Sequence, residues 1–213
     1  KFYLVVNIAP HNSKLQRFVE DMAPAIALKP DALIVSDPGV VFLLRQHFPQ
    51  VPLHLSVQAN TVNWAAVLFW QQQGIERVIL SRELALEEIA QIREKVPEME
   101  LEVFVHGALC MAYSGRCLLS GYINKRDPNQ GACTNACRWS YQSHKAQADE
   151  VGQYRPVHSE LPEPVLVEEQ GRPGELMLLD EDEHGSYIFN SKDLRAVQHV
   201  PALTAMGVHS LKI

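Results

Sequence analysis

Short apolar runs rich in β-branched residues alternate with longer amphipathic segments through the first half of the chain. The runs predict five strands, at 1–8, 31–37, 52–58, 77–81 and 100–107. The amphipathic segments predict helices at 13–22, 39–48, 62–73 and 85–96. Strict alternation with short connections indicates parallel strands joined by right-handed crossovers, and therefore an α/β fold.

The same rhythm returns only near the end of the chain. A run at 186–191, a helix from 193 to 206 and a strand at 208–213 follow a long polar segment, 141–185. That segment carries strand patterns at 165–169 and 175–179 and is predicted to be an insertion. About six parallel strands result, whereas a closed (β/α) barrel has eight.

The fold class predicted is therefore a truncated (β/α) TIM-type barrel. Its units occupy 1–140, with a Cys-rich loop at 106–140, then the insertion at 141–185 and the last barrel strand in 186–213. The chain starts with Lys1 and enters a strand at once. We expect it to be part of a longer protein.

The composition limits the class of protein but does not indicate an activity. The 213 residues are 46% hydrophobic and 21% charged, with a net charge of -6, values typical of a soluble globular domain. A negative net charge gives no overall attraction to nucleic acid or to a membrane surface. Nothing in the sequence argues for secretion, so we expect a cytoplasmic protein.

All four cysteines lie within one glycine-containing segment: Cys110, Cys117, Cys133 and Cys137. Disulfides, a structural zinc site and an iron–sulfur site are the three competing uses of four thiols. Spacing alone makes the iron–sulfur site the leading interpretation. If residues 134–139 continue as a helix, Cys133 and Cys137 lie one turn apart on one face.

Local charge points to the same segment. Residues 103–147 carry a balance of +4, which leaves about -10 for the rest of the chain. The cations in question are Arg116, Lys125, Arg126, Arg138 and Lys145. They indicate either a site for a polycarboxylate or a phosphate backbone, or a solvated loop whose cations balance cluster charge.

Polar residues at predicted strand ends are further candidates, because barrels place their chemistry at the C-terminal ends of strands. They are Asn7, Asp37, Gln58, Asn60, Ser81, Arg82, Glu83 and Lys212. Glu83 and Arg82 form either a base with an anion anchor or an ion pair that caps the next helix. His106 contacts a cluster sulfur or substrate, or is structural.

Aromatic residues are interpreted mainly as packing groups. Trp64, Phe69 and Trp70 have the spacing of a buried helix face. Trp139 and Tyr141 lie beside the cysteines, where they either stack on a base or cover the cluster.

Ten positions in a span of nineteen match a known signature: Glu102, Phe104, Gly107, Ala108, Leu109, Cys110, Gly115, Cys117, Leu119 and Ser120. With them the chain resembles the collagenase-like peptidase family U32. Flanking segments such as LVVNIAPHN, LSVQANTVN and NQGACTNACRW are most similar to its bacterial branch of prephenate-dependent tRNA uridine hydroxylases.

This resemblance implies oxygen-independent hydroxylation of a wobble uridine of tRNA at carbon five, with prephenate as co-substrate. It implies an iron–sulfur cluster, 4Fe-4S in type, held by the four cysteines. It also implies two further β–α units before the first strand and a second domain after the last.

Residue roles follow as hypotheses. His106 and Glu83 are the candidate catalytic groups, and Arg82, Arg116, Lys125, Arg126 and Arg138 the candidate substrate- and RNA-binding groups. The alternatives are a peptidase with Cys110 as nucleophile and His106 as base, hydroxylation of another RNA or of a quinone precursor, and a zinc-bound structural module.

Overall fold

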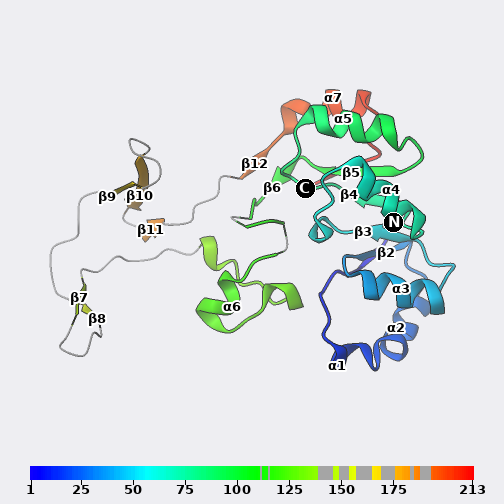
Figure 1. The fold of residues 1–213 in the computed structure, drawn as a ribbon, viewed down its shortest axis with the longest axis horizontal. Coiled ribbons are helices and arrows are strands. Elements are labelled where there is room, and N and C mark those ends of the chain that lie inside the picture. The colour runs from blue at the N-terminus through cyan, green and yellow to red at the C-terminus, as the bar shows by residue number, and fades with distance from the viewer. Residues whose placement is uncertain are drawn as a thin grey trace. The chain divides into compact units, whose positions relative to one another are not determined.

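A computed structural model gives the fold of the chain (Figure 1). It describes residues 1–110, 112–114, 116–138 and 193–213. It also describes the backbone of five strands between 146 and 187. The chain divides into two compact units, residues 1–134 with 191–213, and residues 135–190.

The first unit is built on one six-stranded parallel sheet in the order β1-β2-β3-β4-β5-β13. Its strands are β1 (Tyr3–Val6), β2 (Ala32–Val35), β3 (Leu53–Leu55), β4 (Arg77–Ile79), β5 (Glu100–Phe104) and β13 (Ser210–Lys212). Each of the six predicted parallel strands is present, although shorter than its apolar run. The predicted α/β fold with a parallel sheet is confirmed.

Helices cover one face of this sheet. They are α1 (Asn12–Leu15), α2 (Phe18–Ala27), α3 (Pro38–His47), α4 (Trp64–Gln72), α5 (Leu86–Lys95) and α7 (Val200–Ala205), with α6 (Leu119–Asn124) in the loop after β5. Alternate strand residues such as Leu33, Leu55 and Leu101 join Leu44 and Ile92 of the helices in one buried cluster. Figure 1 shows α5 and α7 as neighbours in this layer.

The helices start where the sequence provides a cap. The Asp37 carboxylate accepts the Val40 N–H at 3.0 Å at the start of α3, and Asn63 does the same for Ala66 at 2.9 Å in α4. At α5, the Glu88 carboxylate accepts the Ala85 N–H at 2.8 Å. These bonds fix the points at which the chain leaves the strand ends.

The opposite face of the sheet carries a polar network. Arg77 binds Glu100 at 2.7 Å and Glu102 at 3.2 Å, and Lys212 binds Glu102 at 3.4 Å. The Tyr3 ring lies 5.0 Å from the His54 ring, and the Arg77 guanidinium lies 5.9 Å from the Tyr3 ring centre. Contacts from β1 to β4 across two intervening strands are those of a sheet curled toward this face.

The network sets the charge states of its members. Burial lowers the pKa of His54 to about 4, and the Arg77 charge adds to this effect. Burial alone would lower the pKa of Arg77, but the hydrogen bonds and charge of its carboxylate partners raise it. The hydrogen bond from Arg77 lowers the pKa of Glu100. His54 is therefore a neutral, buried imidazole at neutral pH.

Two short strands extend the region after β5. β6 (His106–Gly107) pairs antiparallel with β12 (Leu194–Arg195), and Gly107 adopts a φ of 120°, a conformation that favours glycine. The chain segments before and after the second unit are thereby joined beside the sheet.

The second unit is antiparallel where its backbone is described. One sheet has the order β11-β10-β9, and β7 pairs with β8. Its strands are β7 (Ala146–Ala148), β8 (Tyr154–Pro156), β9 (Val165–Glu168), β10 (Leu176–Asp182) and β11 (Gly185–Tyr187). β9 and β10 coincide with the two strand patterns in the predicted insertion.

The predicted helix 193–206 is shorter than expected, because Leu194–Arg195 forms β12 and the helical part covers Val197–Ala205. Two other local predictions are wrong. Residues 133–138, the described part of the expected helix, do not form one helix, because Asn135 has a left-handed φ of 55° and Ala136–Arg138 forms a 3-10 turn. Trp64 and Phe69 are not packed in the core; they are 45% and 50% exposed. Trp70 packs against the core as predicted.

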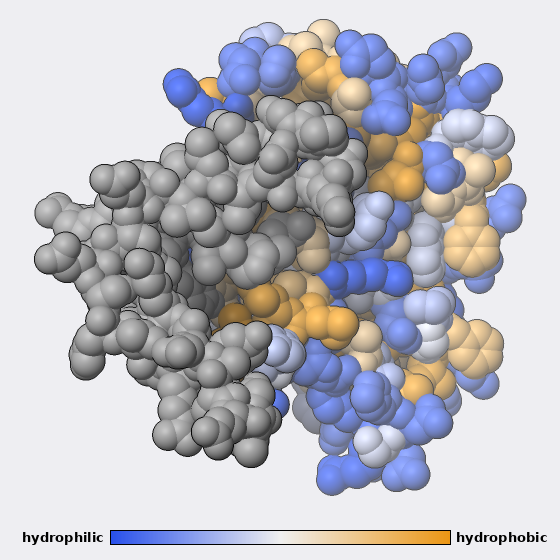
Figure 2. Space-filling model, turned by 60° about the vertical axis from the view of Figure 1, so that its left-hand side comes forward, coloured by the Kyte–Doolittle hydropathy of each residue, from blue (hydrophilic) through white to orange (hydrophobic). Residues whose placement is uncertain are grey.

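Polar residues cover most of the coloured surface seen in Figure 2, with hydrophobic residues in separate patches between them. Among the described residues, no helix has both the length and the apolar character needed to cross a membrane.

Candidate functional site

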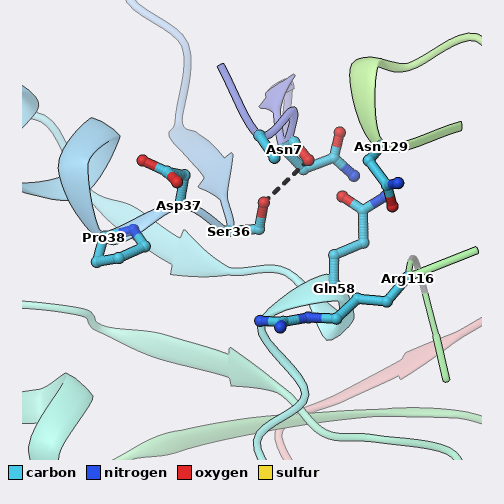
Figure 3. Close-up of a pocket in the computed structure, with 8 residues that line it drawn as sticks. Asn7, Ser36, Asp37, Pro38, Gln58, Arg116 and Asn129 are labelled. Carbon is cyan, nitrogen blue, oxygen red and sulfur yellow. Dashed lines mark hydrogen bonds between the residues drawn. The ribbon is translucent and has the colours of Figure 1, made fainter. Parts of the chain in front are cut away.

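A cavity of about 330 Å³ lies at the C-terminal ends of β1, β2 and β3 (Figure 3). Its walls come from the β1 end, the start of α3, the 3-10 turn η1 (Val57–Ala59) and the loop after β5. The lining residues are Asn7, Ala9, Ser36, Asp37, Pro38, Gln58, Arg116 and Asn129. Three predicted strand-end residues and one predicted cation thus meet at one site.

Hydrogen bonds between strand ends hold the cavity floor. The Ser36 hydroxyl donates to the Asn7 carbonyl at 2.9 Å, and the Asn7 amide approaches the Ser56 hydroxyl at 3.5 Å. The same Ser56 hydroxyl accepts the Gln58 N–H at 3.3 Å. Asn7 and Gln58 are therefore positioned by neighbouring strand ends rather than by flexible loops.

The segment here named the cysteine loop, residues 108–134, closes the other side. Ala9 N–H donates to the Asn129 carbonyl at 2.9 Å, and the Gln130 amide donates to the Ala9 carbonyl. Lys14 adds a hydrogen bond to Gln130 at 2.7 Å. The loop is thus docked on the segment that follows β1.

Asn129 connects this docking to a cysteine. The Asn129 backbone N–H donates to the Asp127 carboxylate at 2.8 Å, and the Asn129 side-chain amide donates to the Cys117 carbonyl at 3.2 Å. Gly131 follows with a φ of 81°, a turn conformation that favours glycine. One residue therefore contributes to the cavity wall and holds the backbone of Cys117.

The charges around the cavity are asymmetric. Arg116 is exposed, and within the described part of the chain its guanidinium makes no hydrogen bond or ion pair. Asp37 is the acid of the lining, and its carboxylate already caps α3. An anionic ligand group is therefore attracted on the Arg116 side and repelled on the Asp37 side.

The Gln58 side chain has an unusual feature for a cavity wall. Its Oε1 atom is buried and accepts no hydrogen bond from the described residues. Asn60 Oδ1, Thr61 Oγ1 and Ser81 Oγ are likewise buried and have no hydrogen-bond partner among the described residues. Buried polar atoms without a partner are uncommon in folded proteins.

Arg82 and Glu83 lie outside this cavity. The Arg82 guanidinium lies 3.9 Å from the centre of the Phe104 ring, and the Lys212 ammonium lies 5.5 Å from it. Glu83 is exposed, and the cap of α5 is Glu88, so the interpretation of Glu83 as a helix-capping ion-pair partner is wrong. A second cationic region therefore lies at the ends of β4, β5 and β13.

The four cysteines differ in exposure. Cys110 and Cys133 are exposed, while Cys117 and Cys137 are half-buried. Cys117 Sγ accepts the Leu119 N–H at 3.4 Å, the kind of contact that supports a sulfur ligand of a metal. Four thiols suit an iron–sulfur cluster in donor type and number. The described residues contain no ready-made group of three metal-ligating side chains.

The remaining candidate residues are dispersed. His106 is exposed on β6 opposite Arg195, and it makes no described hydrogen bond to Cys110. Lys125 ends α6 with a φ of 59°, Arg126 is exposed beside it, and Arg138 belongs to the second unit. Trp139, Tyr141 and Lys145 lie outside the described residues.

Sequence reasoning missed Asn129 and Ser36 as lining residues. Asn129 lies more than one hundred positions from the Asn7 it faces, so no local pattern connects them. Its place in an Asp-Pro-Asn turn beside two cysteines was the available signal.

Comparisons with known proteins agree with the signature. The profile of peptidase family U32 matches residues 1–213. The tRNA hydroxylation protein P of Escherichia coli is 63% identical over 100% of this chain and 50% of its own length. The 23S rRNA 5-hydroxycytidine C2501 synthase of the same organism is 30% identical over 100% of this chain and 27% of its own length.

A solved U32 peptidase structure matches 49% of this chain and 45% of its own chain, with a TM-score of 0.43 and 18% identity. The chain spans about half the length of the tRNA hydroxylation proteins of Escherichia coli and Haemophilus influenzae to which it is similar. Because the family profile covers its full length, the chain belongs to peptidase family U32.

Proposed function

We propose that this protein hydroxylates a wobble uridine of tRNA at carbon five, without O₂ and with prephenate as co-substrate. The observation that carries the proposal is the 63% identity over the whole chain to a tRNA hydroxylation protein. The cavity supports it, because about 330 Å³ accommodates a pyrimidine base beside the cysteine loop.

The sheet is proposed to be six strands of a (β/α) barrel. Its strands follow one another in chain order, as barrel strands do, and they curl toward the face that carries Arg77 and Glu102. Two further strands between β13 and β1 would complete the barrel and place the cavity at its C-terminal mouth.

The proposed cluster ligands are Cys110, Cys117, Cys133 and Cys137. An iron–sulfur cluster, when bound, supplies electron-transfer chemistry that protein side chains lack. Replacing C5–H by C5–OH removes two electrons from the base, and a cluster held by these cysteines would pass them to an external electron acceptor. The contribution of the chain is to hold the base near the cysteine loop.

The proposed anion-binding groups fall into two regions. Arg116, Lys125, Arg126 and Arg138 bind tRNA phosphates around the cysteine loop. Arg82, with Lys212, binds the carboxylates of prephenate beside Phe104. His106 and Glu83 are exposed and are the proposed proton-transfer groups.

Nucleoside mass spectrometry tests the function. Cells lacking the gene are complemented with the full-length gene, as wild type or as Cys117→Ala, and grown without O₂. We expect 5-hydroxyuridine in tRNA with the wild type and at least a ten-fold loss in the variant. Leu118→Ala, at a neighbouring side chain that is 78% exposed, is the matched control and keeps the modification. Unchanged hydroxylation in Cys117→Ala contradicts the proposal.

Metal analysis of the full-length protein, purified without air, tests the cluster separately. A brown protein with iron and acid-labile sulfide is expected, and a colourless protein with stoichiometric zinc contradicts it. Peptide hydrolysis lost in Cys110→Ser but kept in Cys133→Ser would instead support a peptidase. The described geometry does not favour that alternative, because His106 and Cys110 are not hydrogen-bonded to each other.

A further inference from the structure

A closed ring of hydrogen bonds joins α6 to the end of the cysteine loop. Asn124 Nδ2 donates to Thr134 Oγ1 at 2.8 Å, and Ser120 Oγ donates to Asn124 Oδ1 at 3.3 Å. The Ser120 and Thr134 hydroxyl oxygens lie 2.9 Å apart. A hydroxyl has a single proton, and that of Ser120 goes to Asn124, so the Thr134 hydroxyl donates to Ser120. The ring thus fixes the orientation of all three side chains.

The ring is also bonded to the main chain at Cys133. The Thr134 N–H donates to Ser120 Oγ at 3.2 Å, and this nitrogen belongs to the peptide bond between Cys133 and Thr134. Ser120 is 2% exposed, so water competes little for these bonds. A buried hydroxyl of α6 therefore holds the main chain directly beside Cys133.

The same short helix is bonded to Cys117. Leu119, the first residue of α6, donates its N–H to Cys117 Sγ at 3.4 Å. Asn129 holds the Cys117 carbonyl from the other side, at 3.2 Å. Since Ser120 directly follows Leu119, the first turn of α6 contacts the Cys117 thiol and, through the ring, the chain at Cys133. Two of the four cysteines are thus fastened to one helix.

Such fastening affects how strongly thiols bind a metal. Thiols on a free loop lose conformational entropy when a metal brings them together, and a segment that is already fixed loses less. Groups that orient the ligands without touching the metal therefore raise its affinity. The hydroxyls of Ser120 and Thr134 and the amide of Asn124 are bonded to one another, which suits them to this role.

We propose that Ser120, Asn124 and Thr134 are positioning residues of the metal site. Their ring holds the main chain at Cys133 against the helix that contacts Cys117, before the metal is bound. The inference rests on the proposed function for the assignment of the cysteines as metal ligands.

The test measures metal release from the full-length protein, purified without air, to an excess of the chelator pyridylazoresorcinol, which binds iron and zinc. Ser120→Ala removes the hydroxyl shared by the ring and the Thr134 N–H, and alanine favours a helix more than serine does. Thr134→Val removes a hydroxyl at nearly constant shape. Each variant loses at least two hydrogen bonds and is expected to release metal about ten-fold faster than wild type.

Two further variants are controls. Thr134→Ser keeps the hydroxyl and is expected to restore release to within about two-fold of wild type. Thr204→Val removes a threonine hydroxyl that donates to the Val200 carbonyl at 2.9 Å in α7, and it should keep the wild-type rate. Circular dichroism checks that each variant is folded. If Ser120→Ala does not fold, the comparison of Thr134→Val with Thr134→Ser decides.

The outcomes separate this inference from the proposed function. Wild-type release rates in Ser120→Ala and Thr134→Val overturn the inference, and so does Thr134→Ser releasing metal as fast as Thr134→Val. A wild-type protein that carries no metal overturns it as well. The expected pattern with zinc in place of iron supports the positioning role and overturns the iron–sulfur cluster. The expected pattern in a protein that produces no 5-hydroxyuridine in cells supports the positioning role and overturns the hydroxylase proposal.

Discussion

Neutral His54 in the polar network should make the protein lose stability in mild acid. Its side chain lies between Tyr3 and Arg77, the residue is 6% exposed, and its pKa is lowered to about 4. In the unfolded chain the imidazole titrates near 6.5. Between these values the unfolded state binds a proton that the folded state does not, so stability falls as the pH falls.

The size of the effect follows from the shift. Each pKa unit is worth about 1.4 kcal/mol, so the full contribution is about 3 kcal/mol. Integration from pH 7 to pH 5 covers about 2 kcal/mol of it. Glu100, whose pKa is lowered by Arg77, acts in the same direction only at lower pH, below its unfolded value.

Urea unfolding followed by circular dichroism at pH 7 and pH 5 measures the change in the free energy of unfolding between the two pH values. The loss of unfolding free energy between the two pH values should be about 2 kcal/mol smaller in His54→Gln than in wild type. His47→Gln, at an exposed histidine near the end of α3, should leave the loss unchanged. An identical pH dependence in wild type and His54→Gln would refute the assignment of a buried neutral imidazole.

Three further substitutions probe the scaffold by urea unfolding at pH 7. Glu102→Gln leaves Arg77 with Glu100 alone and should cost about 3 kcal/mol, whereas a loss below 1 kcal/mol would mean that solvent screens the pair. Gly74→Ala should cost about 1 to 2 kcal/mol, because φ is 81° and the new Cβ would lie 2.8 Å from Arg45 Nε; no loss would contradict this backbone conformation. Asn63→Ala should cost about 1 kcal/mol by removing the cap of α4, and a neutral result would argue against that cap.

Most of the fold could be predicted from the sequence, because buried parallel strands are uniformly apolar. Runs such as 31–37 and 77–81 contain strands whose residues are all buried, and turn residues separate them clearly from the helices. The buried face of α4 was harder to predict. Trp64, Phe69 and Trp70 are all apolar, so periodicity did not show which of them is buried. Val67 and Trp70 face the core, which leaves Phe69 on the other side.

The residues of the candidate site could be predicted from the sequence only in part. Asn7, Asp37 and Gln58 could be grouped because parallel strands end at one edge of a sheet. Asn129 could not, because its position depends on a docking between residues 9 and 129 that leaves no local pattern. The failure of the helix after Cys133 has a similar origin, since a left-handed asparagine at position 135 is not encoded by helix propensity alone.

Asn129 makes the shape of the cavity and the position of the Cys117 backbone depend on each other. Its carbonyl holds the chain after β1, and its amide holds the Cys117 carbonyl. A rearrangement that moves the Cys117 carbonyl breaks that amide hydrogen bond or displaces the cavity wall. A ligand that binds the wall at Asn129 and a change that moves the Cys117 backbone would then be coupled, each altering the free energy of the other.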